Sequence, residues 1–314
     1  MSFAIPSLAA CALALFLPWW WARRRLRPLT RALQLAAEAE LIELADGAVS
    51  YRWHGPKEGP VVVLVHGFQY YSMWWDPNVE ALVAAGFRVL RYDLYGRGYS
   101  DRPALRYDVE LYDRQLVGLL DGLQLVEAVD LVGASMGGAI ATVFAARHPE
   151  RVRRVALLDP AGLPVNQPAV ARLLKAPLIG PWLTTVFGEK ICIDFALSHW
   201  KDRSLVPVAA ARLREQMAYR GYLQALLSTL RSYPLSDVRQ AYAALGESGR
   251  PVLLLWGEED RTAPIANARS LQALVPQLQF HPIPGVGHSL SYERAELVNP
   301  LLVDFLGTRV LARA

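Results

Sequence analysis

Short apolar runs rich in β-branched residues alternate with helical stretches from about residue 41 onward. Residues 61–65 are apolar without a break, as expected for a central strand that is buried on both faces of a sheet. Between such runs, apolar residues recur every three or four positions, which is typical of amphipathic helices. The alternation predicts a mostly parallel α/β sheet with helices on both faces. The expected strands are residues 41–45, 49–53, 61–65, 89–92, 130–132, 155–158, 252–256 and 279–283.

The alternation lapses between residues 161 and 250, where the chain is rich in Leu, Ala, Pro and Arg. Apolar residues there keep helical spacing, for example at Leu213, Met217 and Leu226. We therefore expect a helical cap at 161–250, inserted after the sixth strand of a core made of residues 41–160 and 251–314. Most apolar side chains of the cap are expected to pack, and others to line a substrate channel. The candidates are Pro177, Pro181, Trp182, Leu183, Phe187 and Phe195.

The N-terminal segment differs from the rest of the chain. No charged residue occurs at 3–22, and a helix of that length spans about 30 Å, the thickness of the hydrocarbon core of a bilayer. Three tryptophans at 19–21 stand directly before a run of arginines, as aromatic and basic residues do at membrane interfaces. A cleaved signal peptide would carry its basic residues before the apolar stretch. We therefore expect a transmembrane anchor at 1–22 and an amphipathic juxtamembrane helix at 23–40, through which two copies can form a homodimer.

Charge and cysteine content narrow the class of protein. The 314-residue chain has a formal net charge of +4, and five arginines between residues 23 and 31 account for all of it. A nucleic-acid-binding protein would spread basic residues over a face of its folded domain, so we expect no nucleic acid partner. The two cysteines, Cys11 and Cys192, do not make a disulfide framework. Cys11 also lacks the preceding positive charge of a lipidation signal.

A Gly-x-Ser-x-Gly motif follows the expected strand at 130–132 and precedes a helical stretch; it reads Gly133-Ala134-Ser135-Met136-Gly137. This context is the one that a nucleophile elbow requires. A serine on so sharp a turn has strained dihedral angles, and Gly133 and Gly137 avoid clashes with it. Ser135 is therefore the candidate nucleophile. The N–H of Met136, at the start of the helix, is a candidate oxyanion donor.

Two further residues complete the order nucleophile, acid, histidine. Asp260 lies just past the expected strand at 252–256, and His288 lies in a glycine-rich loop after the strand at 279–283. Because the carboxyl ends of parallel strands meet at one edge of a sheet, these loops are expected to converge on Ser135. Asp260 would then fix the tautomer of His288, and His288 would accept the proton of the serine.

Other acidic residues are weaker candidates. Asp159 directly follows the strand at 155–158 and is an alternative triad acid. Asp93 is expected to organise the turn that follows it, and Glu258 and Glu259 are expected to be solvated loop charges.

The sequence predicts neither a metal nor a cofactor. It contains no glycine-rich phosphate loop of the nucleotide-binding type, because the Gly96-Arg97-Gly98 turn is not followed by the start of a helix. No metal-ligand spacing is found among four further histidines, namely His54, His148, His199 and His281.

The motifs together resemble the α/β-hydrolase family from about Leu41 to Leu306. They are His66-Gly67-Phe68, residues 93–100, the Ser135 elbow, Asp260 and His288. The resemblance implies the α/β-hydrolase fold with an eight-stranded sheet. Phe68 follows a central strand, so its N–H is the expected second oxyanion donor, while His66 is expected to brace the loop.

The choice among serine hydrolases depends on the expected anchor. Dehalogenases and epoxide hydrolases of this fold have Asp where this chain has Ser135. With an anchor and an apolar cap, the chain most resembles membrane-anchored bacterial phospholipase A and lysophospholipase, which implies lipid ester substrates and fatty acid products. The alternatives are a monoacylglycerol lipase, a carboxylesterase for small esters, a carbon–carbon hydrolase, a perhydrolase, and a protein that binds without turnover. The resemblance implies a periplasmic domain on the bacterial inner membrane, whereas the arginines after the apolar segment favour the cytoplasmic side.

Overall fold

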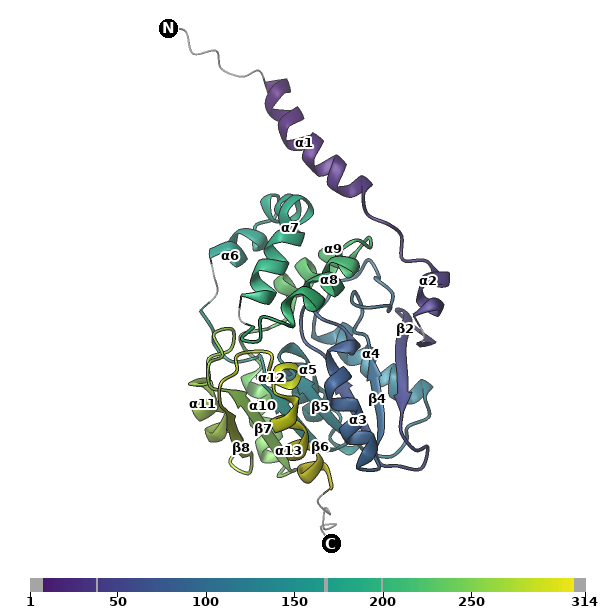
Figure 1. Ribbon diagram of the computed structural model, residues 1–314, viewed down its shortest axis with the longest axis vertical. Coiled ribbons are helices and arrows are strands. Elements are labelled where there is room, and N and C mark those ends of the chain that lie inside the picture. The colour runs from purple at the N-terminus through teal and green to yellow at the C-terminus, as the bar shows by residue number, and fades with distance from the viewer. Residues whose placement is uncertain (1–7, 38, 167–168, 199, 308–314) are drawn as a thin grey trace.

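An eight-stranded sheet forms the centre of the computed structural model, which describes residues 8–37, 39–166, 169–198 and 200–307 (Figure 1). The strand order is β1-β2-β4-β3-β5-β6-β7-β8; β2 runs antiparallel to both of its neighbours, β1 and β4, and the other neighbouring strands are parallel. The expected fold class, a mostly parallel eight-stranded α/β-hydrolase sheet, is confirmed. The strands are β1 (Glu40–Leu44), β2 (Gly47–His54), β3 (Val61–Val65), β4 (Arg88–Tyr92), β5 (Val129–Ala134), β6 (Val152–Leu158), β7 (Val252–Gly257) and β8 (Gln279–Ile283).

The central strands are apolar because both of their faces are covered. β5 and β7 are buried along their whole length, as are residues 62–65 of β3. Each Val or Leu side chain buried in this way contributes about 1.5–3 kcal/mol. The registers of β3, β5 and β6 bring their carboxyl ends to one edge, where the loops carrying the candidate residues begin.

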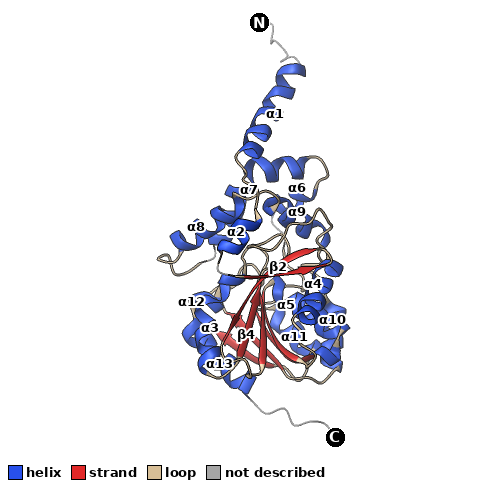
Figure 2. Ribbon diagram, turned by 90° about the vertical axis from the view of Figure 1, so that its right-hand side faces the viewer, coloured by secondary structure: helices blue, strands red, loops and turns tan. Residues whose placement is uncertain are grey.

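Helices cover the two faces of the sheet separately (Figure 2). One face is covered by α3 (Asp76–Ala84), α12 (Leu290–Glu293) and α13 (Ala295–Gly307). The other is covered by α4 (Val109–Gly122), α5 (Met136–Arg147), α10 (Arg239–Glu247) and α11 (Asn267–Leu274). Two short 3-10 helices, η1 (Ser72–Trp75) and η2 (Pro149–Arg151), precede α3 and β6.

Four further helices lie over the carboxyl edge of the sheet; we call them the cap helices (Figure 1). They are α6 (Ala169–Lys175), α7 (Ile179–Leu197), α8 (Val206–Met217) and α9 (Tyr222–Ser232). They fall within the segment where a cap was expected. The next helix, α10, also falls within that segment but packs against α5 of the core.

The expected transmembrane anchor is wrong. Within the described part of the chain, no helix combines the length and the apolar character that crossing a membrane requires. Residues 1–7 of the expected anchor lie outside the described residues, and the rest belongs to α1 (Leu8–Arg24), a helix of 17 residues. α1 lies against α7, where the indole N–H of Trp182 donates to the carbonyl oxygen of Leu15 at 2.9 Å.

The expected juxtamembrane helix at 23–40 is also much shorter than its pattern suggests. Among the described residues of this segment, Arg23 and Arg24 end α1, and the helix that follows is α2 (Arg31–Ala36), where the Thr30 side chain accepts the Leu33 N–H. The strand expected at 41–45 forms as β1, and its pairing with β2 satisfies the backbone of that segment. The homodimer expected to form through an anchor and this helix therefore loses its structural basis.

Candidate active site

Ser135 occupies the sharp turn between β5 and α5, with φ 53° and ψ −120°. A positive φ is strained for a residue with a side chain, and its N–H donates to the Leu158 carbonyl oxygen at 2.9 Å, which holds the turn. A side chain at Gly133 would collide with the backbone of Gly137, and one at Gly137 with the carbonyl oxygen of Val65. The flanking glycines are therefore required by the close approach of three backbone segments.

The structure brings the three residues of the expected triad together. Ser135 Oγ lies 2.8 Å from His288 Nε2, and His288 Nδ1 lies 2.7 Å from Asp260 Oδ2. The other oxygen of Asp260 accepts the N–H groups of Thr262 at 2.7 Å and Ala263 at 2.9 Å. Asp260 is thus fixed by its own loop, with one oxygen left to orient the imidazole.

His288 is held ready to carry a positive charge. Burial alone would lower the pKa of His288, but the charge of Asp260 and its hydrogen bond raise this pKa from 6.5 to about 9. A strongly basic imidazole beside a serine hydroxyl is the arrangement needed to remove the proton of that hydroxyl as it attacks.

The two expected oxyanion donors, the N–H groups of Phe68 and Met136, belong to segments on either side of Ser135. Met136 is the first residue of α5, so its N–H has no partner within the helix. Phe68 belongs to the loop after β3, which comes so near the elbow that a Cβ on Gly67 would lie 3.3 Å from the Cβ of Ser135. Both segments therefore lie next to Ser135.

His66 braces the Phe68 loop, as expected. Its side chain is fully buried; Nδ1 bonds with the Gly67 carbonyl oxygen at 2.9 Å, and Nε2 accepts the Leu94 N–H at 2.9 Å. Burial lowers the pKa of His66 to about 3, so the ring is neutral and can donate at one nitrogen while accepting at the other. These two bonds tie the loop after β3 to the loop after β4.

Asp93 organises its turn, as the sequence predicted. Its carboxylate oxygens accept the Ser72 N–H and the Tyr99 N–H, both at 2.8 Å. Within that turn, Arg97 is completely buried beneath the cap helices, and its guanidinium reaches both the Phe68 loop and α9. No sequence signal predicted that this arginine connects the cap helices to the Phe68 loop.

A cavity of about 500 Å³ lies between the cap helices and the sheet edge, and Ser135 and His288 line it. Its wall is overwhelmingly apolar, and Arg261 is the other side chain on the described lining, besides His288, that can carry a positive charge. Of the six apolar residues proposed as packing or lining, only Phe195 lines the cavity in the described structure. The apolar wall comes largely from Leu174, Ile191, Leu223, Leu226, Leu227, Leu230 and Leu235.

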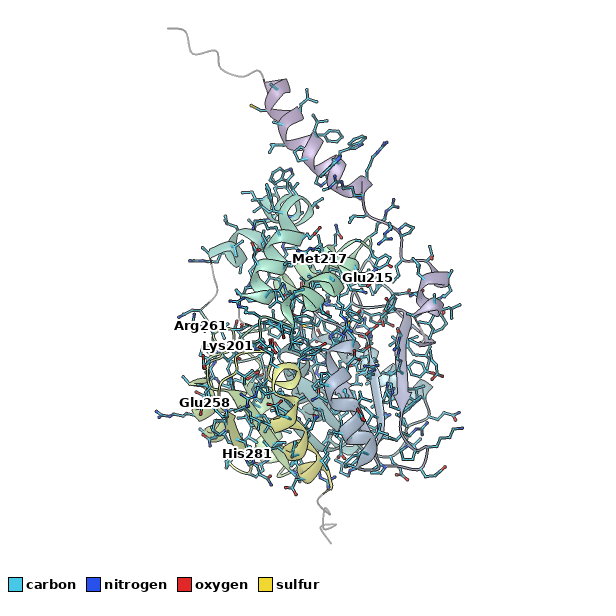
Figure 3. All side chains as sticks on the ribbon, in the orientation of Figure 1. Lys201, Glu215, Met217, Glu258, Arg261 and His281 are labelled. Carbon is cyan, nitrogen blue, oxygen red and sulfur yellow. The ribbon has the colours of Figure 1, made fainter. Side chains whose placement is uncertain are left out.

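The weaker candidates lie apart from the nucleophile. Glu258 and Glu259 are exposed, as expected, and Glu259 forms an ion pair with Lys201. Figure 3 shows Arg261 and Lys201 at the level where the cap helices meet the core, and His281 far below them. His148 lies 3.2 Å from Asp113, His54 is partly buried near Arg91, and His199 lies outside the described residues.

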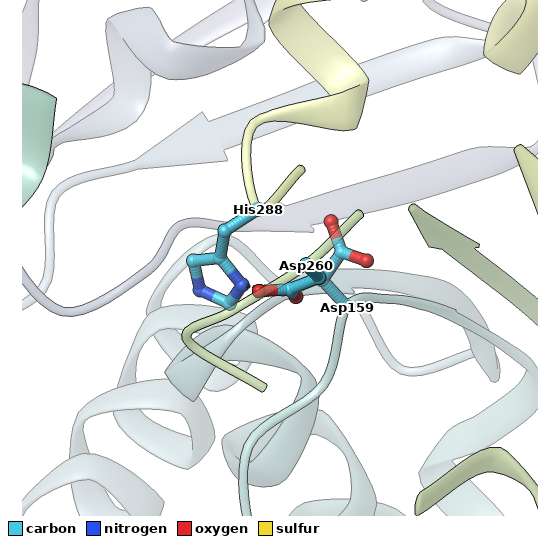
Figure 4. Close-up of side chains that lie close together, drawn as sticks. All are labelled: Asp159, Asp260 and His288. Carbon is cyan, nitrogen blue, oxygen red and sulfur yellow. Dashed lines mark hydrogen bonds and ion pairs between the residues drawn. The ribbon is translucent and has the colours of Figure 1, made fainter. Parts of the chain in front are cut away.

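Asp159, the alternative triad acid, does not contact His288 directly, because Asp260 occupies the Nδ1 position. It lies behind Asp260, on the same side of the imidazole (Figure 4). Of the described residues, Asp159, Asp260 and His288 form the one group of three or more potential metal ligands close enough to share an ion. Within this group, His288 is hydrogen-bonded to Asp260 through Nδ1 and to Ser135 through Nε2.

Comparison with known proteins gives a consistent picture. A family model described as "Alpha/beta hydrolase family" matches residues 62–301. The chain is 31% identical, over 88% of its length and 98% of the relative, to a 2-hydroxy-6-oxononadienedioate/2-hydroxy-6-oxononatrienedioate hydrolase of Cupriavidus pinatubonensis. It is 32% identical to the 2-hydroxy-6-oxo-6-phenylhexa-2,4-dienoate hydrolase of Burkholderia cepacia, over 79% of this chain and 88% of the relative. The crystal structure of an enol-lactonase from Burkholderia xenovorans superposes with a TM-score of 0.74 at 26% identity, covering 86% of this chain and all of that one.

These relatives overturn the substrate that the sequence suggested. They are named as hydrolases of oxo-dienoates, so the expectation of a phospholipase, a lipase or another enzyme of lipid metabolism is wrong. The expected single-pass location in the bacterial inner membrane is also wrong, since the described part of the chain has no helix able to cross a membrane. The error arose because the apolar N-terminal segment was used to choose among substrates that the triad itself does not distinguish.

Proposed function

Because the chain belongs to the alpha/beta hydrolase family, we propose that it is a serine hydrolase of 2-hydroxy-6-oxo-2,4-dienoates with an apolar group at C6. Two findings together support the proposal. The Ser135, His288 and Asp260 side chains are in hydrogen-bonding contact, and relatives over most of the chain are named for this substrate class.

The named substrates fix the bond that is broken. A 2-hydroxy-6-oxo-dienoate has no ester or amide bond, so its hydrolysis must cleave a carbon–carbon bond beside the C6 ketone. If the enol proton first moves from the C2 oxygen to C5, C2 becomes a ketone and C3=C4 the remaining double bond. The electron pair of the C5–C6 bond can then pass through C4 and C3 to the C2 oxygen.

In the proposed mechanism, Ser135 Oγ attacks C6 and His288 Nε2 accepts the serine proton. The N–H groups of Phe68 and Met136 stabilise the oxyanion that forms on the C6 oxygen. Collapse of this intermediate breaks the C5–C6 bond, releases 2-hydroxypenta-2,4-dienoate after protonation, and leaves the acyl group on Ser135. Water activated by His288 then releases the carboxylic acid.

The cavity supports the restriction to apolar C6 groups. One relative is named for dioate substrates and another for a phenyl-substituted dienoate. The C6 side carries a charge in the first kind of substrate and none in the second. Besides His288 and Arg261, the described lining offers no cation for a second carboxylate, and desolvating such a charge without a partner is costly. Arg261, at the cavity, is the proposed partner of the C1 carboxylate that all these substrates share.

The test is to incubate the purified protein with 2-hydroxy-6-oxo-6-phenylhexa-2,4-dienoate. We expect loss of the absorbance of the conjugated substrate and formation of benzoate in equal amount, measured by mass spectrometry. The Ser135→Ala variant is the matched control, and its rate should fall by about 10⁴-fold or more.

Two results would contradict parts of the proposal separately. Turnover of nitrophenyl esters without any benzoate would show a working triad with a different substrate class. Failure of a fluorophosphonate to label Ser135 in folded protein would contradict the triad itself.

A further inference from the structure

Arg102 lies where the loop after β4 meets the cap helices. Its Nη2 donates to the carbonyl oxygen of Gly98 at 3.2 Å and to Oε1 of Gln216, on α8, at 3.3 Å. Its aliphatic part packs against the turn between α8 and α9, where a Cβ on Gly221 would lie 3.0 Å from both Cβ and Cδ of Arg102. Arg102 is not among the described residues that line the active-site cavity, so it connects the core to the cap outside that cavity.

Three buried hydrogen-bond donors at this contact have no acceptor. Nε and Nη1 of Arg102 are closed to solvent and bond to no described residue. Gln216 is completely buried, and its amide nitrogen Nε2 also has no partner there. A guanidinium can only donate, so the bond from Nη2 fixes Oε1 of Gln216 toward Arg102 and leaves Nε2 as the unpaired atom. Buried donors without a partner are rare in folded proteins and indicate a missing acceptor.

The positive charge of Arg102 is also unbalanced. Arg102 forms no ion pair within the described part of the chain, and Asp93, whose charge acts on it, accepts the N–H groups of Ser72 and Tyr99 instead. Burial lowers the pKa of Arg102 from 12.5 to about 10, so it is still charged at neutral pH. Burying a cation without a counter-charge is costly.

Aromatic rings compensate for little of this cost. The guanidinium carbon of Arg102 lies 5.5 Å from the ring centre of Tyr219 and 5.9 Å from that of Tyr222. Both distances are close to the limit of about 6 Å at which an aromatic face stabilises a cation. The contact therefore lacks both a negative charge and an acceptor for three donors.

We propose that Arg102 and Gln216 bind one halide-sized anion, such as chloride, between the loop after β4 and α8. An anion supplies the missing charge and only accepts, which suits a site that offers only donors. A water molecule would bring two protons of its own, whereas the acceptors at this contact, Gly98 O and Gln216 Oε1, already accept Arg102 Nη2. The tight packing at Gly221 favours a monatomic anion over a phosphate or a carboxylate.

The bound anion would hold the cap to the core. α8 and the turn before α9 belong to the cap, and the loop after β4 carries Asp93 and Arg97. This inference is independent of the triad and of the substrate proposed above, so its test does not need an activity assay.

The experiment is a thermal melt of the full chain, followed by circular dichroism, while sodium chloride replaces sodium gluconate at constant ionic strength. General screening is then the same in every sample. The melting temperature should rise by about 2–4 °C over the titration, as expected where chloride exceeds its dissociation constant by about tenfold. Equal melting temperatures in the two salts would overturn the proposal.

Gln216→Glu places a carboxylate beside Arg102 and so replaces the anion. In gluconate this variant should melt about 2 °C or more above the native protein, and it should no longer respond to chloride. A chloride response as large as that of the native protein would contradict the assignment to this site.

Arg102→Met and Arg154→Met form a matched pair. Arg154 is also a buried arginine, but it already has a carboxylate partner, Asp130. Both variants should melt at a lower temperature, and only Arg102→Met should lose the response to chloride. A lost response in Arg154→Met as well would show a general effect of destabilisation and would overturn the proposal. If Arg102→Met does not fold, the response of Gln216→Glu decides.

Crystals soaked in sodium bromide test the position directly. We expect an anomalous peak within hydrogen-bonding distance of Gln216 Nε2 and of Nε or Nη1 of Arg102. A water molecule at that position, with no anomalous signal, would overturn the proposal.

Discussion

Arg97 Nε donates a hydrogen bond of 3.0 Å to the carbonyl oxygen of Phe68, the residue whose N–H is the proposed second oxyanion donor. The same guanidinium donates to the Tyr112 hydroxyl at 2.7 Å and to Thr229 Oγ1 on α9 at 3.0 Å. A completely buried arginine therefore connects the cap helices to the oxyanion loop. Because its five donors lie in a rigid plane, it fixes these partners relative to one another.

The first prediction is that Arg97→Lys lowers kcat more than it raises KM. Lysine keeps the charge but cannot donate to Phe68, Tyr112 and Thr229 in a fixed plane, so the Phe68 N–H moves relative to Ser135. Removing an oxyanion donor costs about 10²–10³-fold in kcat, and we expect about tenfold for its displacement. Steady-state kinetics on the phenyl dienoate measure the effect.

Arg91→Lys is the control for that prediction. Arg91 is also a buried arginine, but it lies on β4 and pairs with Asp76, away from the cavity. We expect it to lower the melting temperature without changing kcat; a similar kcat loss in both variants would show that the effect is general destabilisation.

The second prediction concerns pH. His288 must be neutral to accept the serine proton, and the Asp260 charge raises its pKa to about 9 against the opposing effect of burial. We therefore expect kcat/KM to increase with pH and to level off only above about pH 9, instead of near the usual histidine value of about 6.5. A pH series with the nitrophenyl ester measures the inflection.

The same shift affects stability with a definite sign. A histidine whose pKa is raised in the folded state stabilises that state fully below about pH 6.5, and this contribution is lost as the pH rises through about 9. His288→Gln should therefore reduce the loss of unfolding free energy between pH 7 and pH 10, measured by urea denaturation. An unchanged loss in the variant would contradict the assignment of that shift to His288.

The third prediction is that Leu227→Trp changes which C6 group is accepted. Leu227 lines the cavity from α9, and the larger indole takes space from an apolar pocket of about 500 Å³. The kcat/KM for the 6-phenyl dienoate should fall by about tenfold relative to that for the smaller 6-methyl compound. Equal changes for both substrates would place the C6 group elsewhere in the cavity.

The fourth prediction compares the effect on stability of truncating a buried leucine with that of truncating an exposed one. Leu64 on β3 is completely buried, whereas Leu178, before α7, is 87% exposed. Leu64→Ala should lower the free energy of unfolding by about 2–5 kcal/mol, and Leu178→Ala by less than about 0.5 kcal/mol. Urea denaturation of the two variants gives the comparison, and equal effects would contradict the assigned burial.

By itself, the sequence determined the features that depend on neighbouring residues. The β-branched runs predicted eight strands within a few residues of their observed bounds, because burial on both faces of the sheet leaves little room for polar side chains. The Gly133 and Gly137 pair marked the elbow, since the close approach of backbone there excludes any side chain. The order of Ser135, Asp260 and His288 predicted residues that the structure brings into contact.

Tertiary structure decided whatever depends on residues far apart in the chain. The apolar segment at 3–22 did not show that α1 would lie against α7. The pattern beyond that segment did not show that β1 would pair with β2. Likewise, the local sequence at Arg97 does not predict its contact with Thr229, and the local sequence at Asp159 does not predict its proximity to His288. In each pair the two residues are more than 100 positions apart in the chain. The periodicity of apolar residues shows which face of a helix or strand is buried. Which other element covers that face is decided only when the whole chain folds.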